Sequence, residues 1–234
     1  MSLHVITGGE GAGPPPPPRS SSEEPRFTVL DVESVDFAAT PTLRFHLHVA
    51  DPAGRDVHAI ALSTQIQIQP AKRAYDAETH DRLVELFGVP ERWAATTHPF
   101  QWARIEALVP GFTGATSFAV EVPCTYDLEV ASAKYFHGLR DGKVPLTFHF
   151  SGMVLYRGER DHLQVVPVPW SCHAEWLMPI EAWRRAMDEQ YPGGGWVRLT
   201  PETLDRLAAH KAAGGHFSFD DCVAGMLDTT EDRS

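Results

Sequence analysis

Residues 42–50, TLRFHLHVA, alternate between polar and apolar side chains along almost their whole length. Successive side chains of a β-strand point to opposite faces, so this stretch is typical of a strand with one apolar and one polar face. The apolar face carries Leu43, Phe45, Leu47 and Val49. The polar face carries Arg44, His46 and His48. A strand with one solvated face is typical of an antiparallel sheet, so the stretch favours antiparallel β-structure.

The same period of two continues from residue 26 to about residue 170. It is visible in VHAIALSTQIQIQ (57–69), in SFAVEVPCTYDLEV (117–130) and in VPLTFHFSGMVLY (144–156). The segment RGERD (157–161) then predicts a hairpin to HLQVVPVPW (162–170). One helix interrupts this series at DAETHDRLVELFG (76–88), where Asp76 is a suitable N-cap and Gly88 a stop.

After residue 170 the period becomes helical. Helices are predicted in MPIEAWRRAMDEQY (178–191), TPETLDRLAAHKAAGG (200–215) and SFDDCVAGML (218–227). Strands followed by helices predict an α+β fold. We expect an antiparallel β-sandwich or curved sheet over about residues 26–170, with C-terminal α-helices packed against it.

Composition also divides the chain. Residues 1–25 include a Pro-rich run and predict a disordered tail, and residues 229–234 predict a second one. Residues 26–170 are expected to form a mainly β domain with one inserted helix. Residues 171–228 are expected to form the helical portion of the same domain, because 234 residues suit one large domain.

The charge and the cysteine content exclude several classes of protein. The net charge of −11 argues against a nucleic-acid partner, because phosphate binding needs a concentrated basic face. The three cysteines are odd in number and far apart, which favours a reducing cytoplasm over a disulfide framework. No apolar run reaches the ~18 residues of a membrane span. The start, MSLHVITGGE, does not have the pattern of a secretory signal.

The 12 histidines raise the question of a metal site. His46 and His48 lie two residues apart on one strand face, a spacing that can chelate a metal ion. A third ligand would come from a neighbouring strand, with His58 or His149 as candidates. The alternative is a solvated strand face. The chain has no G-x-S-x-G, H-E-x-x-H or P-loop motif, so no catalytic constellation is recognisable.

Cys172 and His173 are adjacent in the segment VPVPWSCHAEW (166–176). Neither a strand nor a helix directs adjacent side chains toward each other, so we expect no nucleophile–base pair here. Three tryptophans in aromatic-rich segments are candidate anchors for a protein partner: Trp102, Trp170 and Trp176. The alternative for them is an aromatic core, with Trp170 and Trp176 packing where the sheet meets the helices.

Several long segments together resemble an uncharacterised actinobacterial family, a domain of unknown function. They are VHAIAL (57–62), IQIQPAKRAYD (66–76), VPGFTG (109–114), VPCTYDLEVASAKYFHGL (122–139), GKVPLTFHFSGMV (142–154) and MPIEAWRRAMDEQYPGGGWVRLTPETLDRL (178–207). The resemblance covers about residues 26–227. Genes of that family often lie near those of nickel–iron hydrogenases.

The resemblance implies a context and no catalytic residues. We therefore expect a non-enzymatic accessory, assembly or binding protein, with a hydrogenase subunit or maturation factor as its protein partner and without a cofactor. The alternative is a metal-binding protein or metal-dependent enzyme that uses the histidines to hold nickel, iron or zinc. The oligomeric state is left open.

Overall fold

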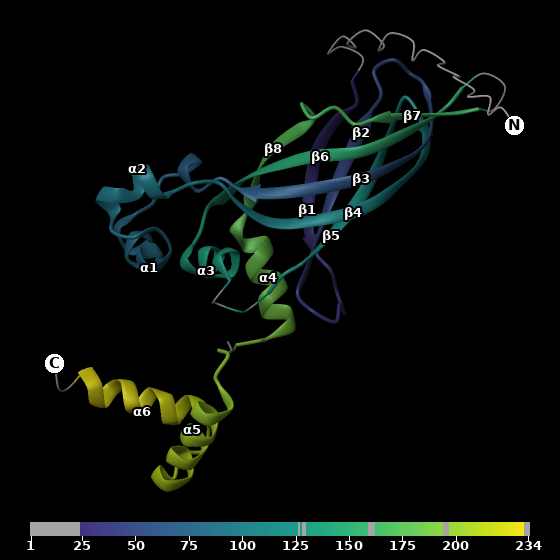
Figure 1. Cartoon of the computed structure of the whole chain (residues 1–234). Helices are drawn as coiled ribbons and strands as arrows, with labels where there is room; N and C mark the ends of the chain where they lie inside the picture. Colours follow the sequence, from purple (N-terminus) through teal and green to yellow (C-terminus); the bar gives the residue numbers. More distant parts are fainter. Residues whose placement is uncertain (1–23, 126, 128–129, 159–161, 194–196, 232–234) are drawn as a thin grey trace, which may run out of the picture.

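The computed structural model describes residues 24–125, 127, 130–158, 162–193 and 197–231 (Figure 1). The tail predicted at residues 1–25 lies outside these ranges except for Glu24 and Pro25, and Pro25 is buried. The last three residues also lie outside them, whereas the final helix runs to Glu231, beyond its predicted end.

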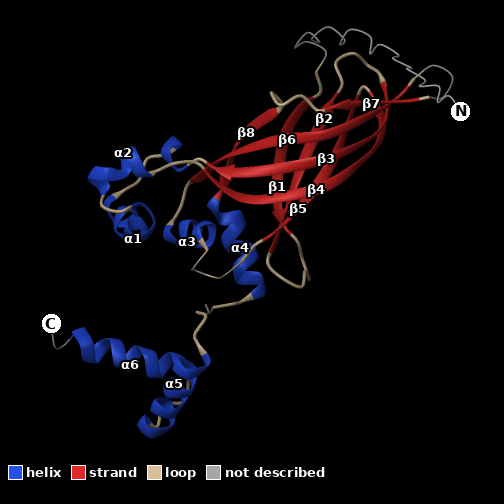
Figure 2. Cartoon of the chain, viewed as in Figure 1, coloured by secondary structure: helices blue, strands red, loops and turns tan. Residues whose placement is uncertain are grey.

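Within these ranges, eight strands form two antiparallel sheets (Figure 2). The first sheet has the order β1-β2-β5, and its strands span Arg26–Ser34, Thr42–Ala50 and Ala115–Pro123. The second has the order β4-β3-β6-β7, with β8 also paired to β6. Its strands span Asp56–Ile68 (β3), Phe100–Thr113 (β4), Lys143–Arg157 (β6), Leu163–Pro167 (β7) and His173–Pro179 (β8).

The apolar face of β2 joins the two sheets. Leu43, Phe45, Leu47 and Val49 are all fully buried. The ring of Phe45 makes edge contacts with three rings of the second sheet, those of Trp102, Phe148 and Trp176. Phe27 of β1 stacks on Phe150 of β6 with 4.2 Å between ring centroids. The predicted α+β fold with antiparallel sheets is therefore confirmed, in the form of two facing sheets.

Helices gather at one end of these sheets (Figure 1). They are α1 (Ala77–Phe87), α2 (Trp93–Thr96), α3 (Ala131–Gly138) and α4 (Ile180–Gln190), with 3₁₀ turns η1 at Pro70–Lys72 and η2 at Pro90–Arg92. Asp76 caps α1 as predicted, because its Oδ1 accepts a hydrogen bond from the Thr79 amide at 2.7 Å. The predicted stripe of α4 is buried too: Ile180, Trp183 and Met187.

The boundary between sheet and helices lies later than predicted. Strand β8 occupies residues 173–179, which the sequence reading placed in the helical portion that starts at 171. Its residues pair with the first half of β6, whereas β7 pairs with the second half. A strand as long as β6 can hold two short partners end to end, and the short alternation in 173–179 was hidden by the helical pattern that follows.

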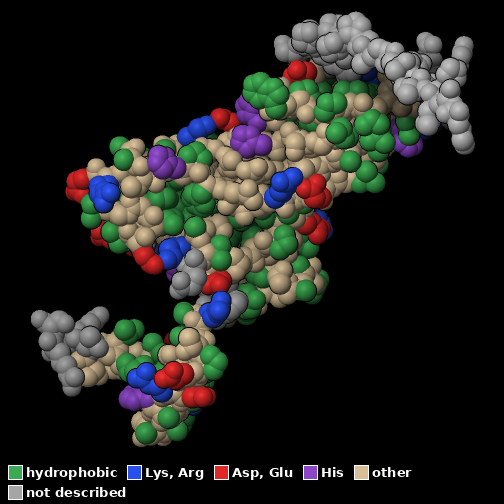
Figure 3. All heavy atoms as spheres, viewed as in Figure 1, with side chains coloured by type: hydrophobic (Ala, Val, Ile, Leu, Met, Phe, Trp, Pro, Cys, Tyr) green, Lys and Arg blue, Asp and Glu red, His purple; other side chains and the backbone are tan. Residues whose placement is uncertain are grey.

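The last two helices, α5 (Pro201–Gly214) and α6 (Phe219–Glu231), pack on each other and lie apart from the sheets (Figure 1). Several large apolar side chains of this hairpin are exposed, among them Phe217 and Leu227. Figure 3 shows hydrophobic side chains (green) on the surface of this part of the molecule. None of the helices within the described ranges has both the length and the apolar character needed to cross a membrane.

Candidate functional site

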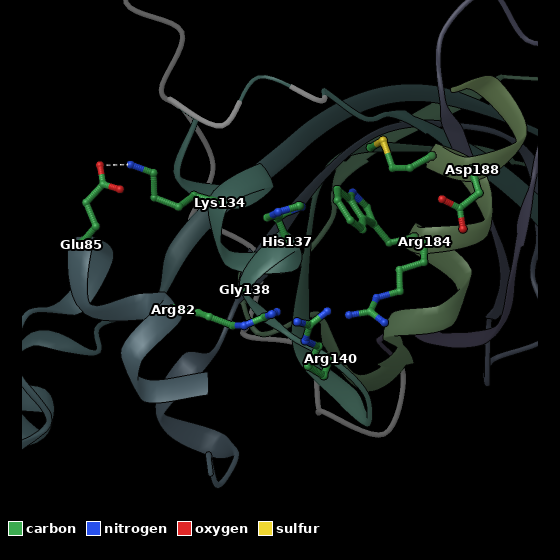
Figure 4. Close-up of a pocket in the computed structure, with 10 residues that line it drawn as sticks. Arg82, Glu85, Lys134, His137, Gly138, Arg140, Arg184 and Asp188 are labelled. Atoms are coloured by element: carbon green, nitrogen blue, oxygen red, sulfur yellow. Dashed lines mark hydrogen bonds and ion pairs between the residues drawn. The ribbon is translucent and has the colours of Figure 1, made fainter. Parts of the chain in front are cut away.

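A pocket with a volume of about 750 Å³ lies where α1, α3 and α4 meet (Figure 4). That volume falls within the ~300–1,000 Å³ typical of small-ligand sites. Four cationic side chains line it: Arg82, Lys134, Arg140 and Arg184. Two carboxylates, Glu85 and Asp188, also line it. The pocket is thus a cationic site on a chain whose net charge is −11.

Local packing brings these helices close enough to form the pocket. Leu83 of α1 is fully buried and lies against Gly138 at the end of α3. A Cβ at position 138 would lie 2.5 Å from Leu83 Cδ2, so a larger residue there would force the Leu83 side chain to move. The buried faces of Trp183 and Met187 hold α4 beside them and leave Arg184 half-buried at the edge.

The arginines of the three segments point into one space. Figure 4 shows the guanidinium groups of Arg82, Arg140 and Arg184 directed toward one another across the pocket. Glu78 balances two of them: its Oε1 lies 3.4 Å from Arg82 Nη2 and 3.3 Å from Arg140 Nε. Arg184 donates to the carbonyl of Leu139 and forms no ion pair with any residue that the structure describes.

Lys134 and two apolar side chains, Trp183 and Met187, complete the lining of the pocket. Lys134 Nζ pairs with Glu85, so this cation is already neutralised (Figure 4). Trp183 and Met187 are almost fully buried and supply an apolar surface beside the arginines. Arginine presents several N–H donors in a planar fork that matches carboxylate and phosphate oxygens. The arrangement suits an anionic group attached to an apolar one.

The metal-site histidines predicted from the sequence lie on different sheets. His46 and His48 are on the outer face of the first sheet and make cross-strand contacts. His46 Nε2 lies 3.1 Å from Glu33 Oε1, and this contact, more than the nearby Arg44, lowers the pKa of the Glu33 carboxyl. His48 Nδ1 lies 3.4 Å from Ser117 Oγ.

His58 and His149 belong to the second sheet. His58 Nδ1 lies 3.1 Å from a guanidinium nitrogen of Arg157. His149 lies beside His173 of β8, with 6.4 Å between ring centroids. Burial, and then the proximity of His173, lowers the pKa of His149. The four predicted histidines therefore do not converge, and within the described residues they form no three-ligand group.

The three candidate tryptophans behave differently from one another. Trp102 and Trp176 are half-buried and pack edge-on against Phe45 in the core. Trp170, which the sequence also placed at the seam between sheet and helices, is 94% exposed in the connection between β7 and β8. Of the three, only Trp170 presents its ring to solvent.

Cys172 and His173 point to opposite sides, as expected. Cys172 is buried and its Sγ donates to the carbonyl of Pro25 at 3.3 Å, whereas His173 is exposed. Burial raises the pKa of the Cys172 thiol to about 11, with a further contribution from Glu24. A thiol with that pKa is a poor nucleophile at neutral pH.

Comparison with known protein families identifies the family of this chain. A model described as a family of unknown function, DUF6084, matches residues 22–234. The chain belongs to the DUF6084 family. No functionally curated protein matches this DUF6084 chain. The expected membership of an uncharacterised family is therefore confirmed.

Solved structures resemble this DUF6084 protein only weakly. A structure assigned to the late embryogenesis abundant proteins is 15% identical and covers 66% of this chain and 71% of its own, with a TM-score of 0.30. The CARDB domain of a Pyrococcus furiosus protein, in complex with two metal ions, is 10% identical and covers 68% and 96%, with a TM-score of 0.26. A Thermotoga neapolitana β-glucosidase is 13% identical and covers 65% and 17%, with a TM-score of 0.24. Likenesses this weak transfer neither a site nor an activity.

The arginine pocket escaped sequence analysis. Arg82, Arg140 and Arg184 are separated by more than 40 residues in each interval and stand in segments with no basic run. The acidic net charge also hides a local cationic cluster. The one signal was that Arg82 and Arg184 lie in predicted helices, which does not by itself bring them close to Arg140.

Proposed function

We propose that this DUF6084 protein is a non-enzymatic binding protein of an accessory or assembly type. Its ligand-binding site in this proposal is the pocket between α1, α3 and α4. The convergence of three guanidinium groups on one space carries the proposal (Figure 4). Like charges in proximity repel, so a bound anion would stabilise this arrangement.

The ligand that fits best is a segment of a partner protein with a carboxylate beside an apolar side chain. The carboxylate would accept hydrogen bonds from Arg140 and Arg184, and the apolar side chain would pack on Trp183. In this proposal Arg184 contributes most to binding the carboxylate, because it forms no ion pair with any of the described residues.

Two adjacent arginines of α4 provide a matched test. Arg184 lines the pocket, whereas its neighbour Arg185 is exposed and outside it. The full chain, as wild type, Arg184→Gln and Arg185→Gln, serves as bait in lysate of the native host. The partner identified by mass spectrometry is then titrated by calorimetry. A lost charge-assisted hydrogen bond costs ~1.5–3 kcal/mol, or roughly 10–150-fold in affinity.

We expect that loss for Arg184→Gln and none for Arg185→Gln. Equal affinity of all three proteins for every captured partner contradicts the pocket as the binding site. Thermal stabilisation of the wild type but not of Arg184→Gln by inorganic phosphate or succinate, with no change in protein capture, assigns the pocket to small anions instead.

We further propose that the partner is a subunit or maturation factor of a nickel–iron hydrogenase. This part rests on the resemblance to an actinobacterial family whose genes lie near such operons. Deletion of the gene in the native host is expected to reduce hydrogenase activity or cofactor loading, and a hydrogenase protein is expected among the captured partners. Normal loading in the deletion strain, together with capture of unrelated proteins only, contradicts the hydrogenase association while leaving the pocket untouched.

A further inference from the structure

The C-terminal hairpin has well-defined ends. Thr200 caps α5 through its Oγ1, which accepts a hydrogen bond from the Thr203 amide at 3.3 Å. Gly215 ends α5 in the left-handed conformation, with φ of 70°. At the start of α6, Ser218 and Asp221 exchange side-chain to backbone hydrogen bonds of 3.1 and 2.9 Å. The backbone between the two helices is therefore held in one conformation.

Three metal-ligating side chains meet at this connection. His210 comes from the last turns of α5, His216 follows Gly215, and Cys222 comes from the first turn of α6. One ring nitrogen of each histidine and the Cys222 sulfur all lie within 4.8 Å of one another. It is the one group of three such residues among those that the structure describes.

The hairpin is built around the His216 ring. A Cβ at position 214 would lie 2.6 Å from ring atoms of His216, so glycine leaves the space that the imidazole fills. A Cβ at Gly225 of α6 would be in ordinary contact with the same ring at 3.5 Å. The ring also stacks on that of His210, with 6.3 Å between centroids and 27° between planes. These contacts keep His216 in position between the two helices.

The hairpin has little else to hold it together. Helix α5 has no buried residue. Cys222, with 0% exposure, is the only buried side chain in the described part of α6. Small units with so little apolar core are commonly stabilised by a structural metal. The single fully buried group here is a thiol, which is the preferred soft ligand of such metals.

We propose that His210, His216 and Cys222 bind one zinc ion, or a similar divalent transition metal. Two imidazole nitrogens and one thiolate are typical zinc ligands. In a tetrahedral site neighbouring ligand atoms are roughly 3.3–3.6 Å apart, which follows from metal–ligand bonds of ~2.0–2.3 Å. Small rotations of the side chains convert the present spacing into that geometry. Three protein ligands leave a fourth position for water or for a ligand from another protein.

This site is separate from the arginine pocket and from the histidines first considered. None of its ligands is His46, His48, His58 or His149, which lie on the sheets. Its failure or success is independent of the proposed binding function.

Metal titration of the full chain, purified without a histidine tag and treated with chelator, tests the proposal. Zn²⁺ binding is followed by elemental analysis after dialysis. Co²⁺ serves as the spectroscopic probe, because a bound thiolate gives a charge-transfer band and tetrahedral geometry gives intense visible bands. Wild type is compared with Cys222→Ser, His216→Ala and, as the matched control, His46→Ala/His48→Ala. Circular dichroism of each apo protein shows whether the variant has folded.

We expect one equivalent of Zn²⁺ in the wild type and in the His46→Ala/His48→Ala control. We expect loss of that equivalent in His216→Ala, and loss of both the equivalent and the thiolate band in Cys222→Ser. An unchanged equivalent in Cys222→Ser overturns the proposal, as does a wild type that retains no metal. Loss of the metal in the His46→Ala/His48→Ala control alone would place the site on the sheet and also overturn it. If Cys222→Ser does not fold, the thiolate band of the wild type with Co²⁺ decides the question.

Discussion

Replacement of Phe45 by alanine tests how the two sheets are held together. Its side chain is fully buried, and its ring makes edge contacts with Trp102, Phe148 and Trp176 at centroid distances of 5.9, 5.3 and 5.9 Å. A buried Phe→Ala change costs ~3–5 kcal/mol. Each aromatic pair adds ~0.5–1.5 kcal/mol beyond its burial. The cost of a whole Phe→Ala change already includes lost ring contacts, and because three pairs are lost here we expect the upper part of that range, about 4–5 kcal/mol of unfolding free energy.

Urea unfolding followed by tryptophan fluorescence measures this loss, since Trp102 and Trp176 touch the altered position. Phe45→Leu keeps most of the volume but loses the ring contacts, so we expect a loss of about 1.5–3 kcal/mol. The control Leu108→Ala removes an exposed side chain of β4 and should change stability by about 0.5 kcal/mol. A loss below about 2 kcal/mol for Phe45→Ala, with an unchanged dependence on urea, would refute the role of Phe45 as the contact between the sheets.

Three further predictions concern backbone strain and the buried thiols. Gly152 has φ of 128°, and a Cβ there would lie 2.0 Å from the Ala61 carbonyl oxygen, so Gly152→Ala should cost at least about 3 kcal/mol in urea unfolding. Phe37 is fully exposed and has φ of 57°, a conformation that glycine adopts without the cost paid by other residues. Phe37→Gly should therefore stabilise the fold by about 0.5–1 kcal/mol and raise the melting temperature. An unchanged or lower melting temperature contradicts this. Burial raises the pKa of Cys124 to about 12 and that of Cys172 to about 11, so iodoacetamide at pH 8 should modify neither until urea unfolds the chain. The unfolded thiols ionise near pH ~8.5, whereas the folded thiols stay protonated there, so the contribution of the two thiols to stability is complete below pH ~8.5. That contribution is lost as pH rises toward the pKa values of the folded thiols. Alkylation of either thiol in the native protein at pH 8, mapped to Cys124 or Cys172, contradicts the burial.

The strands were predictable where burial alternates without interruption. In β2 the four residues of the predicted apolar face, Leu43, Phe45, Leu47 and Val49, are buried, because adjacent side chains face opposite sides of the sheet. The caps at Asp76 and Thr200 were also predictable, since an N-cap depends on a hydrogen bond within one turn. The last strand of the second sheet, β8, was not predictable from the sequence. It is too short to show a clear period, and its partner β6 lies about 30 residues earlier in the chain.

The candidate sites depended on contacts that no local pattern encodes. His46 and His48 were chosen because their spacing suits chelation, yet spacing cannot show that His58 and His149 are on the other sheet. Trp170 and Trp176 looked alike in one aromatic segment, but one is exposed and the other packs on Phe45. Arg82, Arg140 and Arg184 became a group only when three helices packed together.

The sequence by itself determined the α+β class, the antiparallel strands, the helix caps and the resemblance to an uncharacterised family. These depend on alternation, on capping chemistry and on identity, which are all local properties of the chain. The tertiary structure alone decided which residues converge. It brought three distant arginines to one pocket, and it brought His210, His216 and Cys222 together across one helical hairpin. The physical reason is that a binding site needs side chains close in space, and proximity between segments is fixed by packing and not by sequence spacing.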